Sequence, residues 1–182
     1  GKAADGGNGG ATMAYGVEIS GGLAHLDLQA IESLIHSNYF SAGDGGQGES
    51  IKKQAGQDVI ASLGGTGGRM TAAGVHTTGG KTDGRIGKIT MGGTGGNGGV
   101  GGEGKSSIGG SGGNGGDAYT AGISAAGGEL ELEVAGMDIS VYGGDGGSIG
   151  LMTKSTENVA ATGKVQATGG TGGTASAFGL DN

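Results

Sequence analysis

The stretch GGTGGNGGVGGEGKSSIGGSGGNGG, residues 92–116, consists almost entirely of Gly-Gly-x triplets, and shorter copies recur along the chain. Glycine supplies 52 of the 182 residues, whereas ordinary usage is roughly 7%. Collagen is excluded because it needs proline and a strict triplet period, while this chain has no proline and its runs are short. The stretch therefore calls for another glycine-based structure.

Residues 92–104 keep the triplet phase for longer than a turn requires. This run predicts an extended, left-handed rod of polyproline II geometry, with about three residues per turn and no internal hydrogen bonds. The shorter GGxGG copies are either the same rod in miniature or turns, in which glycine tolerates positive φ. Because buried backbone groups must be paired, we expect such rods to lie side by side and to exchange hydrogen bonds.

An internal repeat organises the chain. The spacing GGxGG, five residues, Gly, an aliphatic residue, three residues and GG starts at residues 6, 64 and 112, and a fourth copy starting at 169 is cut short, so the offsets are 58, 48 and 57 residues. A looser class of glycine run lies between the copies, at residues 43–48, 92–104 and 143–147. Repeats at such periods are typical of arrays. We expect one elongated repeat domain over residues 1–182, and an all-β fold (a β-solenoid or a sandwich) that mixes short strands with GGx rods.

Between the glycine runs lie strand-like segments. Residues 129–134 (ELELEV) alternate, which places Leu130, Leu132 and Val134 on one face and three glutamates on the other. Residues 28–39 fit an amphipathic helix or a strand, and their alignment with 129–142 favours a strand. The other predicted strands include residues 58–62, 86–91, 137–142 and 164–168. With only six aromatic residues, any core must be thin.

Composition excludes several classes of partner. The formal net charge is −7, and no basic cluster exceeds Lys52-Lys53, so we expect no nucleic-acid binding, which needs a basic face. No run approaches the roughly 20 apolar residues of a membrane span. The absence of cysteine excludes disulfides and thiolate metal sites. The sequence shows no signal peptide and no initiating Met, so Gly1 is interpreted as the start of a processed product or of a fragment.

One segment matches an enzyme motif. Residues 99–106 (GVGGEGKS) fit the phosphate-binding loop GxxxxGK[ST]. That loop needs an apolar strand before it and a helix after it, so that amides and the helix dipole converge on phosphate. Here glycine runs flank it on both sides. We therefore predict no nucleotide site, no other cofactor and no enzymatic activity.

A second motif concerns calcium. Residues 112–120 fit the β-roll nonapeptide GGxGxDxUx, which makes Asp117 the candidate metal ligand. Such sites need tandem copies, and the position equivalent to Asp117 is occupied by other residues after the other runs: Ala11, Arg69, Ser148 and Thr174. Other carboxylates could bind calcium at a subunit contact, but a solvated acidic face is favoured: Asp5, Asp44, Asp145, Glu129, Glu131 and Glu133.

The histidines and the threonines of the GGx triplets do not indicate a specific site. His25, His36 and His76 lie in different units without metal-ligand spacing, so we expect surface or interface histidines. Threonines at the x position of GGx triplets could accept O-glycans, form a small polar rim or belong to a flat ice-binding face: Thr66, Thr94 and Thr171. The ice-binding interpretation is disfavoured because the x positions mix Thr, Asn, Asp and Ser.

The runs GGTGGNGG and GGSGGNGG, each joined to a small-residue strand ending in Gly and an aliphatic residue, resemble the glycine-rich repeat regions of large bacterial secreted and surface proteins, such as mycobacterial PGRS-type regions and adhesin stalks. The chain departs from the mycobacterial type in lacking a helical N-terminal domain and in having charged strands. Springtail glycine-rich antifreeze proteins share GGx rods but have disulfides and proline. The bacterial resemblance implies an extracellular, structural or adhesive role.

These observations predict a subunit of an extracellular filament or surface fibre. The last repeat has its first strand without the second, and an array cut within a repeat exposes an edge that can template pairing. A neighbouring subunit's first unit would cover it, giving a head-to-tail homopolymer. The predicted contact residues are Gly6, Met13, Tyr15, Val17, Gly169, Ala175, Phe178 and Leu180. The alternative is an adhesin or phage-fibre module that binds carbohydrate or protein at a cell surface.

Overall fold

The computed structural model describes residues 4–32, 40–52, 61–105, 109–150, 152–153 and 167–181. The fold is all-β, since these residues form strands and contain no helix. The strands are β1 (Thr12–Ile19), β2 (Leu23–Glu32), β3 (Phe40–Ser41), β4 (Ile51–Lys52), β5 (Met70–Thr94), β6 (Gly104–Lys105), β7 (Ala118–Val134), β8 (Met137–Tyr142), β9 (Met152–Thr153) and β10 (Ala175–Asp181).

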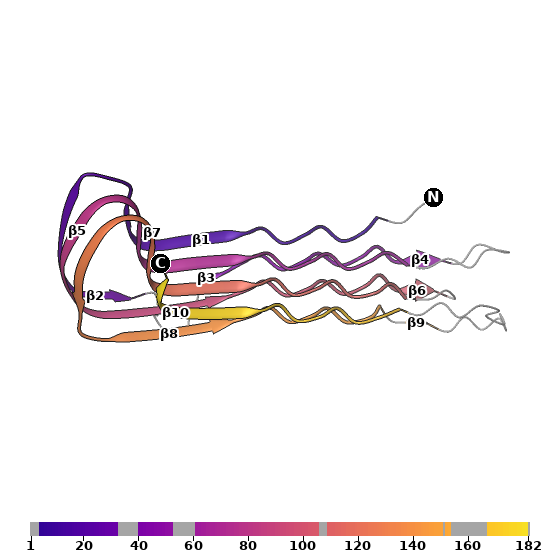
Figure 1. Ribbon diagram of the computed structural model, residues 1–182. Coiled ribbons are helices and arrows are strands. Elements are labelled where there is room, and N and C mark those ends of the chain that lie inside the picture. Colours follow the sequence, from indigo (N-terminus) through magenta and orange to yellow (C-terminus); the bar gives the residue numbers. More distant parts are fainter. Residues whose placement is uncertain are drawn as a thin grey trace.

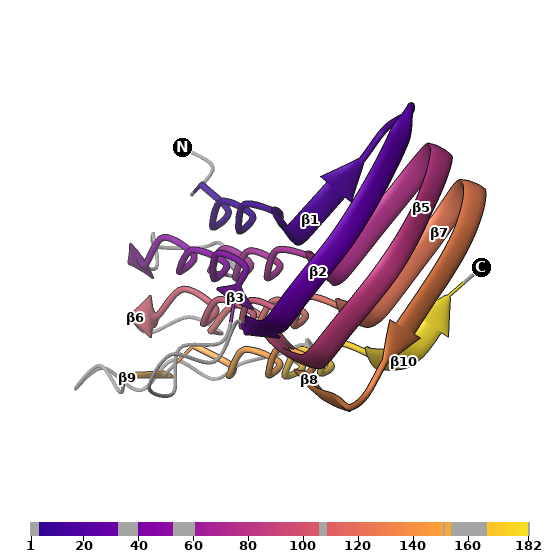
Figure 2. The same ribbon diagram turned by 90° about the vertical axis from the view of Figure 1, so that its left-hand side faces the viewer.

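Every strand pair is parallel. In the larger sheet, β1, β5, β7 and β10 follow one another, and β2, β3 and β8 pair with the remaining length of β5. A second sheet, β4-β6-β9, lies at the far end of the molecule. The larger sheet curves around one end, and glycine-rich segments run from it side by side (Figures 1 and 2). The curved end therefore forms a cap on a bundle of extended segments.

The sheet register repeats the offsets of the sequence repeat. Thr12 lies opposite Met70, Met70 opposite Ala118, and Ala118 opposite Ala175. These partners are 58, 48 and 57 residues apart. The side-chain hydrogen bonds Leu63–Asp5, His76–Ser124 and Thr171–Asn114 join residues at the same three separations. Parallel in-register pairing brings equivalent side chains into rows, because side chains alternate with period two along each strand. Copies of the sequence repeat are thus neighbours in space.

The bend of the cap depends on glycine. Gly22, Gly80 and Gly128 have φ of 78°, 83° and 93°, values that L side chains rarely adopt. Each immediately precedes a register partner of the next strand stretch, namely Leu23, Lys81 and Glu129. The GG that ends each sequence repeat is therefore where the chain turns from one side of the cap to the other.

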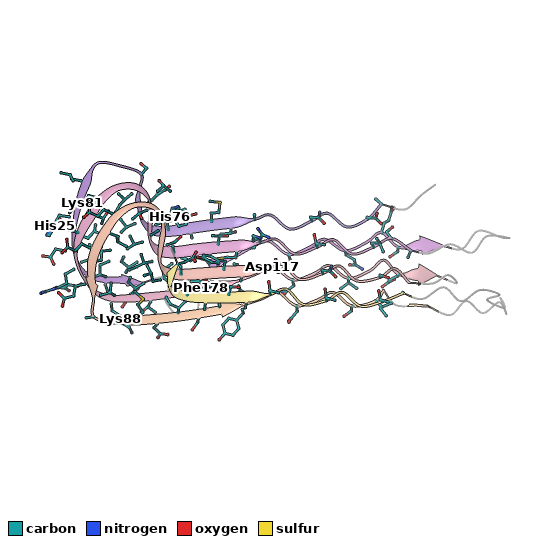
Figure 3. All side chains as sticks on the ribbon, in the orientation of Figure 1. His25, His76, Lys81, Lys88, Asp117 and Phe178 are labelled. Atoms are coloured by element: carbon teal, nitrogen blue, oxygen red, sulfur yellow. The ribbon has the colours of Figure 1, made fainter. Side chains whose placement is uncertain are left out.

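The apolar side-chain core lies in the cap. Its innermost residues are fully buried apolar side chains: Met70, Val75, Ile86, Ile89 and Met91. Leu130, Leu132 and Val134 pack against this core while Glu129, Glu131 and Glu133 are exposed, so the predicted alternation of residues 129–134 is confirmed. Figure 3 shows the side chains concentrated in the cap and sparse along the glycine segments. The core is as thin as the composition requires.

We number the glycine segments in chain order. They are the first (residues 4–11), second (42–50), third (61–69), fourth (95–103), fifth (109–117), sixth (143–150) and seventh (167–174). Backbone hydrogen bonds arrange them in two rows: an odd row of the first, third, fifth and seventh, and an even row of the second, fourth and sixth. The expectation that glycine runs exchange backbone hydrogen bonds is confirmed.

Two sets of bonds recur. Within a row, each segment donates to the segment two later, as in Gly64 N to Ser111 O at 2.9 Å. Between rows, each segment donates to the segment just before it, as in Gly113 N to Gly99 O at 2.9 Å. A Cβ at Gly113 would lie less than 3.0 Å from the carbonyl of Gly65. Glycine is required there because the rows approach backbone to backbone.

Two predicted strands differ from the structure. Ala61 and Ser62 belong to no strand, nor do Ala167 and Thr168, although residues 58–62 and 164–168 were expected to be strands. These residues belong to glycine segments, whose hydrogen bonds replace strand pairing, as in Gly102 N to Ser62 O.

Residues 28–32 are in β2, as the alignment favoured. Other predictions lie outside the described residues, among them those for His36 and Ser106, because the structure does not describe residues 33–39, 53–60, 106–108 and 154–166.

Candidate assembly edges

The stacked segments end in two edges. We call the first edge the one formed by β1, β2 and the first and second segments, and the last edge the one formed by β10, residues 129–134 of β7, β8 and the sixth and seventh segments. Among the described residues, β1 pairs only with β5, and β10 pairs only with β7. In Figure 1, β1 and the first segment lie at the top of the stack, and β8 lies at its bottom.

The first edge carries half of the predicted contact residues. Gly6, Met13, Tyr15 and Val17 all lie on the first segment or on β1. Met13 is 70% exposed, and Tyr15 stacks on His76 with ring centroids 4.4 Å apart. This edge therefore presents an apolar and aromatic strand to solvent.

The last edge carries the other half. Gly169, Ala175, Phe178 and Leu180 lie on the seventh segment or on β10. Leu180 is 60% exposed, while its register partner Ile123 is buried. The structure thus brings the predicted residues together as two groups on opposite edges of one molecule, and the contact between the groups stays a prediction.

Backbone groups at the edges complete this picture. In the part of the chain that the structure describes, the amides of Gly169 and Gly172 donate no hydrogen bond, whereas the equivalent amides of Gly112 and Gly115 donate to Thr168 and Thr171. On the first edge, the carbonyls of Asp5 and Asn8 accept none within the described ranges. One edge offers donors and the other offers acceptors at equivalent positions of the repeat.

Tyr119 anchors β10 to the sheet. Its hydroxyl donates to Asp181, and its ring lies 5.5 Å from that of Phe178. Burial first, and then the hydrogen bond to Asp181, raise the pKa of Tyr119 to about 12. The phenol is therefore neutral and a donor at physiological pH, which holds the edge strand in place.

Asp117 has a structural role. Its carboxylate accepts from the amide of Thr174 at 2.9 Å and from the Thr174 hydroxyl at 2.7 Å, and Arg69 lies 3.8 Å away. The Thr174 hydrogen bonds lower the pKa of Asp117. No group of three or more His, Asp or Glu side chains that could hold a metal occurs among the described residues. Asp117 links the fifth and seventh segments, and calcium binding by Asp117 stays a disfavoured hypothesis.

Charged residues form a ladder on the outer face of the cap, which sequence reasoning missed. Lys81 Nζ lies 2.8 Å from Glu129 Oε1, and Arg85 Nη2 lies 3.1 Å from Glu133 Oε2. His25 pairs with Asp83, and this hydrogen bond raises the pKa of His25. Aligning the repeats at their 48-residue offset would have placed Lys81 opposite Glu129 and Arg85 opposite Glu133.

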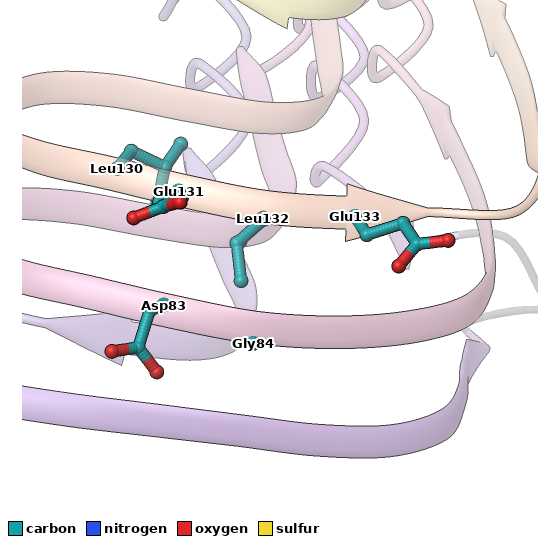
Figure 4. Close-up of a pocket in the computed structure, with 6 residues that line it drawn as sticks. All are labelled: Asp83, Gly84, Leu130, Glu131, Leu132 and Glu133. Atoms are coloured by element: carbon teal, nitrogen blue, oxygen red, sulfur yellow. The ribbon is translucent and has the colours of Figure 1, made fainter.

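The ladder borders a shallow, open depression between β5 and β7 (Figure 4). Its lining residues are Asp83, Gly84, Leu130, Glu131, Leu132 and Glu133. Two of these carboxylates already have partners, since Asp83 bonds His25 and Glu133 bonds Arg85. Its lining residues include no nucleophile beside a base.

No model of a known protein family matches the chain, and no curated protein matches it. Among solved structures, the chain is similar to the nine polyproline type II helical bundle springtail antifreeze protein from Granisotoma rainieri, with 23% identity, 84% of this chain and 98% of that chain covered, and a TM-score of 0.21. A similarity at this TM-score supports no argument about fold or function. No helix long and apolar enough to cross a membrane is found in the described ranges.

Proposed function

We propose that this protein is a non-catalytic structural subunit of an extracellular filament or surface fibre that polymerises head to tail. The whole chain is one elongated, coiled repeat array, and its glycine segments are GGx rods of polyproline II geometry. In this polymer, β10 and the seventh segment of one subunit bind β1 and the first segment of the next. The observation that carries this proposal is that β1 and β10 are equivalent strands of the same repeat, and each lacks a second partner among the described residues.

The internal register specifies the contact. Ala175 follows Ala118 in the row of equivalent residues that also contains Met70 and Thr12. Continuing this row places Thr12 of the next subunit opposite Ala175. Tyr15 of that subunit then lies opposite Phe178, and its Val17 opposite Leu180. The contact is a parallel strand pair that repeats the existing pairing without a change of geometry.

Backbone complementarity supports the same contact. Within the odd row, Gly9 N donates to Thr66 O, Gly67 N to Asn114 O, and Gly115 N to Thr171 O. The next bond in this row would run from Gly172 N to Asn8 O of the next subunit. An exposed strand edge is a template for pairing. Because the two edges differ, the contact is heterologous and repeats without closing, which produces a filament.

The test removes one backbone donor. Gly172→Pro lacks the amide, while its side-chain position has no backbone atom closer than Gly144 O at 3.5 Å, and proline suits a polyproline II rod. We expect this variant to remain a folded monomer and to form no filaments in negative-stain electron microscopy or sedimentation. Gly172→Ala, which keeps the amide, is the matched control and should polymerise. Normal filaments from Gly172→Pro would contradict the proposed contact.

A further inference from the structure

The two rows have unequal numbers of segments, and this leaves a place unfilled at the last edge. The described chain has four segments in the odd row and three in the even row. A subunit added through β10 and the seventh segment continues the odd row. It does not extend the even row, because its own first segment is an odd-row segment. Among the described residues, a place for one even-row segment therefore remains beside the sixth segment.

Backbone groups surround this place. Gly95 N and Gly98 N donate within the even row to Tyr142 O and Asp145 O, whereas their equivalents Gly143 N and Gly146 N donate no hydrogen bond in the part of the chain described. On the neighbouring seventh segment, the carbonyls of Gly170 and Gly173 accept none within those residues, although the equivalent Gly113 and Gly116 carbonyls accept from Gly147 and Gly144. Two donors and two acceptors thus face one site.

In the cap, the strands next to this place are also unpaired on one side among the described residues. Leu130, Val134 and Ile139 are half-buried, while their register partners on β5 are completely enclosed: Thr82, Ile86 and Met91. Residues 129–134 and β8 pair with β5 on one side, and no strand pairs with their other side among the described residues. A further strand on that side would bury these apolar side chains.

Charge indicates what this strand would carry. Glu129 and Glu133 belong to the stretch of β7 whose other side has no strand partner among the described residues, and their side chains are 67% and 70% exposed. On the paired side they are matched by Lys81 and Arg85, four residues apart. The corresponding strand of a second copy is β2, whose Asp27 would lie opposite Glu133, since Asp27, Arg85 and Glu133 form one row. Like charges directly opposite are destabilising, so a second copy is a poor occupant.

Close backbone contacts specify which residues the glycine-rich part of the occupant must have. In the fourth segment, a Cβ at Gly95 or Gly96 would lie less than 3.0 Å from the carbonyls of Gly116 or Gly43. Both glycines of each triplet are therefore required in an even-row segment that is flanked on both sides. Only the x position, such as Asn97, tolerates a side chain.

We propose that the edge formed by residues 129–134, β8 and the sixth segment binds, in trans, a segment of another polypeptide. That segment is a strand with Lys or Arg at two positions four residues apart, followed about ten residues later by Gly-Gly-x triplets. Its cations pair with Glu129 and Glu133, and its triplets accept from Gly143 and Gly146 and donate to Gly170 and Gly173. This mode adds a strand to an exposed edge, and it extends the bonding pattern that the chain already uses internally.

The probe is a synthetic peptide with the sequence of residues 81–102, which has the required cations and triplets and already pairs with the other side of the same edge. It is titrated into isotope-labelled Gly172→Pro protein, and NMR follows the amides of Gly143 and Gly146. This background separates the test from the filament proposal, because binding does not depend on polymerisation. We expect saturable shifts and slowed hydrogen exchange at these two amides, with no change at Gly7 and Gly10 on the first edge.

Two control peptides test the chemistry. Replacing Lys81 and Arg85 of the peptide by Glu should weaken binding by about tenfold, since two exposed ion pairs become repulsive. Replacing Gly96 and Gly99 of the peptide by Ala should abolish protection of Gly143 and Gly146. Equal binding by all three peptides, no binding, or shifts confined to Gly7 and Gly10 would each overturn the proposal. Protection of Gly143 and Gly146 by unlabelled protein alone would make a second copy the occupant, and would also overturn it.

Discussion

Asn97 accepts a hydrogen bond through Oδ1 from the backbone amide of Asp145, at 2.9 Å. Asn97 is the x residue of a triplet in the fourth segment, and Asp145 is the x residue of the next segment in the even row. The same kind of bond, from a backbone amide to a side-chain oxygen, recurs elsewhere: from Leu63 to Asp5, from Thr66 to Asn8, from Asn97 to Asp44, from Thr168 to Ser111, from Thr171 to Asn114 and from Thr174 to Asp117. The three amides of a triplet thus bond within the row, between the rows, and to a side chain.

This side-chain ladder should contribute to stability. Asn114→Ala leaves the amide of Thr171 without its side-chain acceptor, and we expect a loss of about 1 kcal/mol in the free energy of unfolding, the usual contribution of a hydrogen bond. Val100→Ala, at an x position with no acceptor atom, is the control and should change stability by less. Urea denaturation compares the two. Equal effects would show that the ladder is energetically neutral.

Glycines of the inner and outer faces should respond differently to alanine. A Cβ at Gly116 would lie less than 3.0 Å from the carbonyl of Gly68, whereas a Cβ at Gly7 would have nothing within 4 Å. Gly116→Ala should therefore destabilise by about 1–3 kcal/mol or more, as overpacking does. Gly7→Ala should be neutral or stabilising by up to about 1 kcal/mol, because it restricts the unfolded chain. Thermal unfolding of both variants in the monomeric Gly172→Pro background checks this, and similar melting temperatures would contradict the close packing of the rows.

A charge on β10 should block polymerisation. Leu180 is 60% exposed at the last edge, and Val100 is 42% exposed on the fourth segment, which is flanked on both sides in its row. Leu180→Lys should abolish filaments, since burying a lysine at the contact costs free energy. Val100→Lys should leave them intact. Sedimentation of both variants at matched concentration decides the point, and filaments from Leu180→Lys would exclude β10 from the contact.

The His25–Asp83 pair should make stability depend on pH. The hydrogen bond that the His25 ring donates to Asp83, and then the charge of Asp83, raise the pKa of His25 above its usual 6.5. Because the folded-state pKa is the higher one, the stabilisation is fully present below the unfolded-state value of about 6.5 and is lost as pH rises through the folded-state pKa. Asp83→Asn should lower the pKa of His25, as an NMR titration of its ring protons would show. An unchanged pKa in that variant would mean that Asp83 is not the cause.

The local pattern of the chain predicted much of the cap. Residues 129–134 alternate as expected, and β8 has the bounds Met137–Tyr142 that the sequence indicated. Residues 61–62 and 167–168 were assigned wrongly because small residues such as Ala61 suit a glycine segment as well as a strand. Their state depends on neighbours that lie tens of residues away. The role of x residues such as Asn114 was missed for the same reason, because its partner Thr171 is 57 residues distant.

By itself, the sequence determined the all-β class, the register offsets and the need for close backbone contact. These follow from local patterns: period-two alternation, exact spacing of the repeats, and a glycine content that leaves little side-chain volume. Only the tertiary structure decided that the glycine segments occupy two rows of unequal number, and which amides and carbonyls remain at the edges. Backbone amides and carbonyls are chemically the same at every glycine. Their pairing therefore depends on which segments lie side by side, and the residue types alone do not predict that arrangement.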